Sequence, residues 1–330
     1  MMKQSIFSAL VVAFGSVSWA NAADYTNPVG NLDPQENELV HIPPTMEDLE
    51  AANIRPELKQ VIRRGYDLFM NTQQLRGEFV FNSMNCQSCH MGEGRMPFAG
   101  PIWPAATTLP DYRGKNKHVN SLEERIAGCF AFSMNGIPPE YGSDNMLAIS
   151  SYIQWLAKGS PVYPDQKIYG RGYPKLPDPE QTPDYKRGKQ TFMENCSICH
   201  GDNGAGLVQN EEVVFPALWG DTSYNWGAGI VRKYTLASFI RHNMPLGQPN
   251  SMSVQQSWDL AEFINSQERP QDPRFLGDVA STRTEFESSF HKHTNYGLTV
   301  NGVVLGDHEN FGEKPIRMPE MLGPRTFGAE

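Results

Sequence analysis

A motif of cysteine, two other residues, cysteine and histidine occurs twice in the chain. The two copies consist of Cys86, Cys89 and His90, and of Cys196, Cys199 and His200. On a helical turn this spacing directs both thiols along one edge of a haem and brings the imidazole under the iron. One copy alone would also suit half of a zinc site. Two copies, each preceded by a similar helical segment, predict two covalently bound haem c groups with iron ligated by the two histidines.

The sixth iron ligand separates electron transfer from catalysis, because it sets the potential of the iron and access to it. For the second haem we expect Met244, which lies 44 residues after His200 and between two predicted helices. His242 is the rival ligand. A thioether favours reduced iron, so this haem is predicted to transfer electrons. The carbonyl of Pro216 is expected to accept a hydrogen bond from the outer nitrogen of His200.

Three residues are candidates for the sixth ligand of the first haem: Cys129, Met134 and His118. Met134 also lies 44 residues past its histidine. Alignment of the helices that precede the two ligand positions instead places Cys129 one residue from the methionine position. Cys129 is the one cysteine of five that lies outside the two motifs, and it has no partner for a disulfide within the chain. Unpaired cysteines are usually small buried apolar residues, so spacing alone leaves this choice open.

The segments around the two motifs repeat along the chain. Residues 64–70 resemble residues 187–193 at an offset of 123 residues. Apolar residues at helical spacing predict a helix that begins at Pro56, and closing helices over residues 145–157 and 253–264. Helix, haem motif, loop, distal segment and helix is the order of a small cytochrome c. We therefore expect an all-α fold with two tandem c-type cytochrome domains.

Composition divides the chain into five segments. They are a signal peptide over residues 1–22, an N-terminal cytochrome c domain with the first haem over 23–158, a linker over 159–183, a C-terminal cytochrome c domain with the second haem over 184–268, and a C-terminal extension over 269–330. The linker holds six prolines and three glycines. The extension is rich in glycine, proline and charge with weak periodicity, so we expect it to be long and irregular and to wrap the surface.

The first residues predict export to the periplasm. Lys3 precedes a short apolar stretch, and small residues follow that suit cleavage after Ala22. No later stretch has the length of a transmembrane helix, so the product is expected to be soluble. The formal net charge of −9 argues against nucleic acid and anionic membranes as partners. An anionic substrate would therefore need a local cluster of arginines.

Residues 125–136, around Cys129, resemble the active-site segment of dihaem thiosulfate dehydrogenases, which are related to SoxA-type cytochromes. The resemblance extends over both haem domains, roughly residues 47–266, and not over the extension. It implies an enzyme that converts two thiosulfate ions to tetrathionate with release of two electrons, and that in some members also runs backwards. It further implies that the electrons pass through the second haem to a small c-type cytochrome or a similar acceptor.

The resemblance also implies roles for individual residues. Cys129 becomes the distal iron ligand and the reactive thiol, Arg125 and Arg113 bind the anion, and Ser133 is a nearby polar contact. Some relatives have a lysine before the methionine of the second haem, whereas this chain has Asn243 there. That difference favours a stable histidine and methionine ligation of the second iron. On the residues alone, a haem propionate remains an alternative partner for Arg125.

Three other functions stay open. A plain dihaem electron-transfer cytochrome would have two irons with histidine and methionine ligands and an inert Cys129. A SoxA-like subunit of a thiosulfate-oxidising complex would carry its cysteine-ligated haem in the C-terminal unit, whereas here the additional cysteine lies in the N-terminal unit. A dihaem peroxidase is disfavoured because no comparable active-site segment is present.

Overall fold

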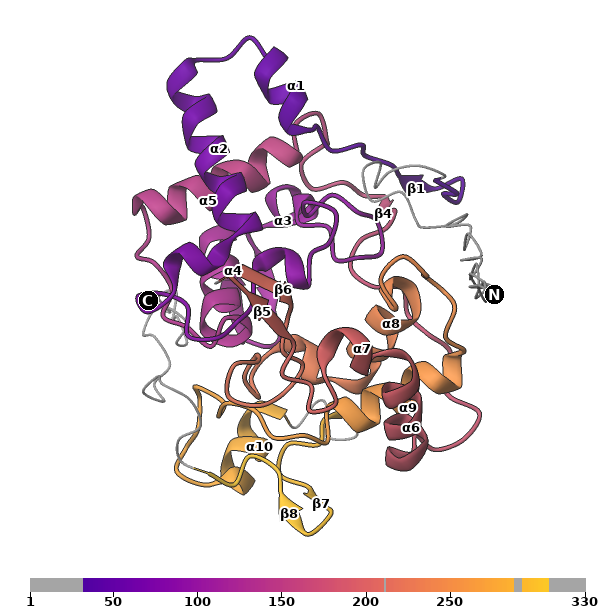
Figure 1. The fold of residues 1–330 in the computed structure, drawn as a ribbon. Coiled ribbons are helices and arrows are strands. Elements are labelled where there is room, and N and C mark those ends of the chain that lie inside the picture. Colours follow the sequence, from indigo (N-terminus) through magenta and orange to yellow (C-terminus); the bar gives the residue numbers. More distant parts are fainter. Residues whose placement is uncertain (1–31, 211, 288–292, 309–330) are drawn as a thin grey trace, which may run out of the picture.

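The computed structural model describes residues 32–210, 212–287 and 293–308. The predicted signal peptide lies outside these residues, as does the end of the extension. The described chain is built mainly from helices, with short strands in two-stranded pairs, as the all-α prediction requires (Figure 1). None of its helices is both long and apolar enough to cross a membrane.

The helices are α1 (Met46–Ala51), α2 (Pro56–Met70), α3 (Trp103–Thr108), α4 (Leu122–Gly128), α5 (Asp144–Leu156), α6 (Tyr185–Asn195), α7 (Ser197–His200), α8 (Lys233–Asn243), α9 (Val254–Ile264) and α10 (Val279–Glu287). The strands are β1 (Glu38–Leu39), β2 (Asp111–Arg113), β3 (His118–Asn120), β4 (Lys167–Ile168), β5 (Leu207–Gln209), β6 (Glu212–Phe215), β7 (Thr299–Val300) and β8 (Val303–Val304). The predicted start at Pro56 and both predicted closing helices are confirmed to within one residue.

The sequence repeat corresponds to a repeated helix packing. In the N-terminal part α2 packs along α5, and in the C-terminal part α6 packs along α9. Each pair meets at the glycine of the repeated segment. A Cβ added to Gly65 would lie 2.0 Å from the carbonyl oxygen of Ala148, and one added to Gly188 would lie 2.0 Å from that of Asp259. Both glycines are therefore required by the close approach of two backbones.

The two haem domains share buried structure. Tyr224 and Trp226 come from the C-terminal part but belong to the hydrophobic core built around α2 and α5. The backbone N–H of Ser83 donates to the carbonyl oxygen of Thr222 at 2.9 Å. The side-chain amide of Asn82 donates to the carbonyl oxygen of Ser223 at 3.1 Å. These contacts fix the position of each haem motif relative to the other.

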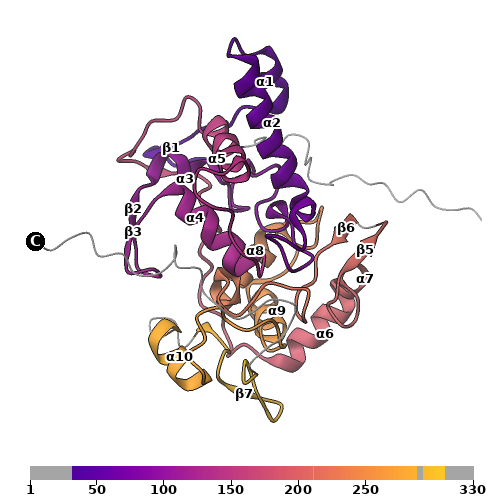
Figure 2. The same ribbon diagram turned by 90° about the vertical axis from the view of Figure 1, so that its left-hand side faces the viewer.

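The described part of the extension holds α10 and the β7–β8 hairpin between irregular segments, on the side of the molecule away from α1 and α2 (Figure 2). The prediction that the extension wraps the surface is wrong for its first residues, since Arg269, Asp272 and Arg274 are buried. Arg269 packs against aromatic rings, with its guanidinium carbon 4.5 Å from the ring centre of Tyr224. Arg274 pairs with carboxylates. The prediction relied on the weak apolar periodicity of this segment. The segment is nevertheless buried, because its charged side chains are paired with one another or packed against aromatic rings.

Candidate functional site

The first haem motif opens into an apolar cavity of the N-terminal domain. Cys86, Cys89 and His90 line it together with Cys129, Ser133 and Met134, and the remaining walls are mainly apolar. Burial raises the pKa of both Cys86 and Cys89 to about 12, so these two thiols are neutral. Two neutral thiols and one imidazole in an apolar wall fit a covalently attached haem, because the thioether bonds bury no charge.

The histidines of the two motifs are held in the same way. Nδ1 of His90 lies 2.5 Å from the carbonyl oxygen of Gly100, and Nδ1 of His200 lies 3.0 Å from that of Pro216. The contact expected for Pro216 is therefore present. Such a carbonyl fixes the ring and leaves Nε2 available to bind iron.

A second cavity, of about 500 Å³, collects the second motif. This volume is typical of a cofactor site. Cys196, Cys199, His200 and Met244 all line it. His242, the rival ligand, is not part of its wall, and Nδ1 of His242 contacts the carbonyl oxygen of Ser238 at 2.9 Å. Met244 follows the last residue of α8, at the position that the spacing predicted.

The two cavities have a common wall. Met84, Asn85 and Cys89 border both of them, although these residues belong to the N-terminal domain. The chain thus contains two haem c groups, one in each cytochrome c domain, and the structure brings the two sites against each other.

Cys129 begins a π-helix, Cys129–Ser133, that continues α4. Nη1 of Arg125, one turn earlier, donates to Sγ of Cys129 at 2.9 Å, and the side chain of His90 also hydrogen-bonds this thiol. Burial acts to raise the pKa of Cys129, but the charge of Arg125, the contact with His90 and the charge of Arg113 lower it to about 6. Cys129 is therefore a thiolate at neutral pH, unlike the two cysteines of the motif.

The two rival ligands of the first iron lie differently. Met134 lines the same cavity as Cys129, and its backbone N–H donates to the carbonyl oxygen of Cys129 at 3.0 Å. His118 is outside the cavity wall. Its ring contacts the carboxylate of Glu124 and the side chain of Asn120, and all three are buried. Of the three candidates, Cys129 is the one for which the structure gives a contact with His90.

The structure also brings the predicted anion-binding residues together. Arg113, on β2, has its pKa lowered to about 10 by burial and by the nearby charge of Arg125. The charge of Arg232 lowers it further, although Arg232 belongs to the C-terminal domain. Ser133 lines the cavity beside Cys129. Arg232 was not anticipated, because nothing in its local sequence signals that the two domains meet at this point.

Known proteins resemble the chain over most of its length. Residues 77–162 match the family model described as SoxA/TsdA, cytochrome c domain, and residues 185–268 match the family model of cytochrome c. The chain is 47% identical to the thiosulfate dehydrogenase of Thiomonas intermedia over 78% of its own length and 81% of that protein. It is 40% identical to the thiosulfate dehydrogenase of Stutzerimonas stutzeri over 93% of its length and 99% of that protein.

A solved structure agrees. The chain matches the thiosulfate dehydrogenase TsdBA of Marichromatium purpuratum with a TM-score of 0.75 and 42% identity, over 82% of this chain. It spans 58% of the length of that longer chain.

Proposed function

The chain belongs to the thiosulfate dehydrogenase family of dihaem cytochromes c, and from this premise we propose that it joins two thiosulfate ions into tetrathionate. Cys129 is the residue we assign to the reaction and to the distal side of the first iron. The observation that carries the proposal is the position of its sulfur, which contacts both Arg125 and His90 within the first haem cavity.

The residues around Cys129 suit an anionic substrate. Thiosulfate is a dianion, and guanidinium groups hold its sulfonate oxygens with charge-assisted hydrogen bonds. Arg125 and Arg113 would supply these bonds, and Ser133 a further polar contact. Their positive charge offsets the negative charge of the chain as a whole.

The chemistry balances as one two-electron oxidation followed by one exchange at sulfur. The thiolate of Cys129 and the terminal sulfur of one thiosulfate form a sulfur–sulfur bond and release two electrons. A second thiosulfate then attacks the sulfur that was added, forms tetrathionate and restores the thiolate, as in thiol–disulfide exchange. The haems that Cys86, Cys89 and His90 and that Cys196, Cys199 and His200 would hold would supply two one-electron acceptors. Because the exchange step converts one sulfur–sulfur bond into another, the same residues also serve tetrathionate reduction.

We assign electron exit to the C-terminal domain. Met244 would give its haem a high potential, which suits the receiving end of the path. Ile198, inside the second motif, is 89% exposed and is not part of the cavity wall. Exposed apolar side chains at such a site favour a brief contact with a small partner, such as another c-type cytochrome. The sequence of residues 1–22 favours the periplasm as the compartment.

One experiment tests the ligand and the reaction together. The purified holoprotein is given thiosulfate and ferricyanide, tetrathionate is quantified, and the reverse reaction is followed with tetrathionate and a reduced viologen. Electron paramagnetic resonance of the oxidised protein then identifies the ligands. We expect tetrathionate at one mole per two moles of ferricyanide, and a low-spin thiolate-ligated iron.

The alternative is a plain electron carrier, which is supported by the presence of Met134 in the same cavity as Cys129. Two irons with histidine and methionine ligands and no tetrathionate would establish the carrier and refute the enzyme. Sequencing of the mature N-terminus after expression with residues 1–22 tests export, and a start at Ala23 is expected.

A further inference from the structure

The backbone of the π-helix that carries Cys129 is bonded to the C-terminal domain. Asn225 is fully buried. Its side-chain amide donates to the carbonyl oxygen of Ala131 at 2.8 Å, and its backbone N–H donates to that of Phe132 at 3.2 Å. A π-helix shifts its carbonyls out of the regular α-helical ladder, and buried carbonyls need a partner. Asn225 supplies two such partners from outside the N-terminal domain.

The ring of Phe132, in the same π-helix, lies between the amino group of Lys115 and the guanidinium of Arg274. Nζ of Lys115 lies 3.7 Å from the ring centre and the guanidinium carbon of Arg274 lies 5.1 Å from it. Arg274 is within the range of cation–π attraction. Lys115 is in contact with the ring, and burial lowers the pKa of Lys115 well below its usual value. Nζ of Lys115 also donates to the carbonyl oxygen of Gly227 at 2.5 Å. A Cβ added to Gly227 would lie 2.5 Å from the ring of Phe132, so the loop and the ring are in tight contact.

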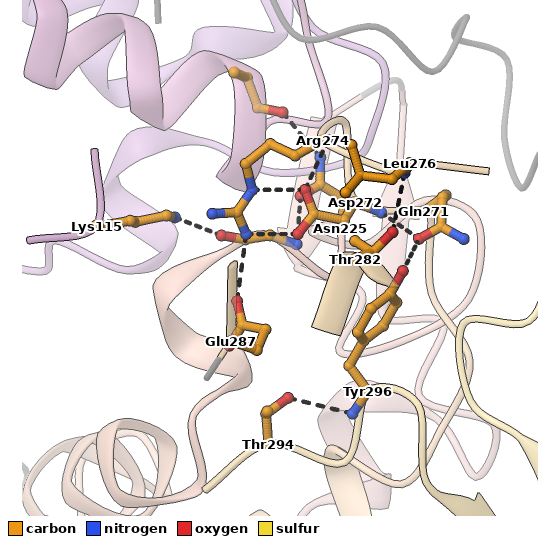
Figure 3. A network of polar contacts seen from close by, with 12 residues as sticks. Lys115, Asn225, Gln271, Asp272, Arg274, Leu276, Thr282, Glu287, Thr294 and Tyr296 are labelled. Carbon is orange, nitrogen blue, oxygen red and sulfur yellow. Dashed lines mark hydrogen bonds and ion pairs between the residues drawn. The ribbon is translucent and has the colours of Figure 1, made fainter. Parts of the chain in front are cut away.

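Arg274 comes from the extension and is itself fixed by carboxylates (Figure 3). Its Nε and Nη2 donate to the two oxygens of Asp272 at 2.9 and 2.6 Å, and Nη2 reaches Glu287 at 3.3 Å. The side chains of all three residues are 4% exposed or less. A buried bidentate pair of this kind is rigid, and removal of one partner leaves an uncompensated charge. Lys115 lies beside the same groups.

We propose that Lys115, Arg274 and Asn225 are positioning residues that set the direction in which Cys129 points, and that the extension exists in part to supply Arg274. Phe132 lies one turn after Cys129. A ring packed between Lys115 and Arg274, together with carbonyls held by Asn225, holds the π-helix in one conformation. The inference rests on the function proposed above for Cys129, but the contacts that carry it do not depend on the substrate.

The test compares variants of the holoprotein that alter the contacts of Phe132. Lys115→Met removes the amino group that bonds Gly227 and contacts the ring, and Phe132→Leu removes the ring. Arg274 still pairs with Asp272 and Glu287 in both variants. Lys115→Arg keeps a hydrogen-bond donor near the ring and near Gly227. Lys117→Met is the matched control, because Lys117 belongs to the same hairpin and pairs with Glu285 of α10 at 2.7 Å, but at an exposed position.

Two measurements are made on each variant. Hydrogen exchange of residues 129–136 reports whether the π-helix is held, with the peptides of α6 and α9 as internal references. Electron paramagnetic resonance of the oxidised protein reports the ligation of the first iron. We expect Lys115→Met and Phe132→Leu to speed exchange of residues 129–136 by about tenfold, to leave α6 and α9 unchanged and to split the low-spin signal of the first iron into two. Lys115→Arg and Lys117→Met should match the unmodified protein.

The inference is overturned if residues 129–136 exchange at the unmodified rate in both Lys115→Met and Phe132→Leu. It is equally overturned if α6 and α9 accelerate to the same extent, because the residues would then stabilise the fold as a whole. An unmodified protein without a thiolate signal would refute the ligand assignment of Cys129. The exchange data would still decide whether the π-helix is positioned as proposed.

Discussion

The two haem domains hold the histidine side of their cavities alike and differ on the opposite side. His90 and His200 each contact a backbone carbonyl through Nδ1. On the opposite side, one cavity has Cys129 on a π-helix, with Arg125 hydrogen-bonded to its sulfur. The other cavity has Met244 after the end of α8. A repeated scaffold thus binds the same cofactor twice, and in the function proposed above the opposite segment distinguishes the substrate site from the electron-transfer site.

The backbone explains how this difference arises. When α4 is aligned with α8, Cys129 falls opposite Asn243. Asn243 is buried and its side-chain amide donates to the carbonyl oxygens of Phe239 and Phe98, at 3.1 and 3.3 Å. In the C-terminal domain Asn243 is therefore the last residue of α8, and Met244, which follows it, lines the cavity. In the N-terminal domain the equivalent residue, Cys129, itself lines the cavity, and the wider turn of the π-helix begins there.

Substitution of Cys129 tests the difference between the two haem sites most directly. Cys129→Ala removes the sulfur that Arg125 and His90 contact, so kcat for tetrathionate formation should fall by at least about 1000-fold, as when other nucleophiles are removed. Met134→Leu is the control, since it conserves volume in the same cavity and should change kcat by less than about threefold. The opposite pattern, with Met134 essential and Cys129 dispensable, would make the two haem sites equivalent.

Arg125 tests whether the first site is built for an anion. Arg125→Gln should lower kcat/KM for thiosulfate by about 10- to 100-fold, which corresponds to about 1.5–3 kcal/mol for hydrogen bonds to a charged group. Arg125→Lys should recover part of the loss. Arg63→Gln, in an exposed pair with Glu50, is the control and should have no effect. A variant with unchanged KM but an altered potential of the first haem would instead assign Arg125 to a propionate.

Met244 tests the other site. Met244→Leu removes the thioether, so the potential of the second haem should fall by on the order of 100 mV. A redox titration followed by the absorbance of each haem measures this shift. His242→Gln is expected to leave both potentials unchanged because His242 is turned toward Ser238. A shift in that variant and none in Met244→Leu would transfer the ligand role to the histidine.

The smallest effect is expected at the exit for electrons. Ile198→Asp places a charge on an exposed apolar residue of the second motif, and reduction of a small acceptor cytochrome should slow by about two- to fivefold. Turnover with ferricyanide should be unchanged. Val162→Asp, at a residue of the linker that is 66% exposed, is the control and should leave both rates as they were. Equal slowing in both variants would argue against a specific exit at the second haem.

Local patterns predicted much of this molecule. The spacing of cysteine and histidine identified two haems, and helical periodicity located the helices that flank them. Met244 was selected from its distance to His200 and its position between two predicted helices, and it lines the second cavity. Each of these signals lies within a few dozen neighbouring residues. His118 was a wrong candidate because its partners, Glu124 and Asn120, could not be identified from spacing.

What could not be predicted depends on contacts between distant segments. Lys115, Asn225 and Arg274 surround one phenylalanine but come from three different parts of the chain. The extension has weak periodicity and much charge, a pattern typical of a surface segment. Its burial becomes understandable only when Asp272 and Glu287 are seen to neutralise Arg274.

The wall shared by the two cavities has a kinetic consequence. A porphyrin joined to Cys89 would border the neighbouring cavity directly, because Cys89, Met84 and Asn85 line both. Electrons would then pass from one haem to the other across this shared wall, without movement of either domain. The two haems would together hold the two electrons of one catalytic event. They would then release these electrons one at a time to electron acceptors.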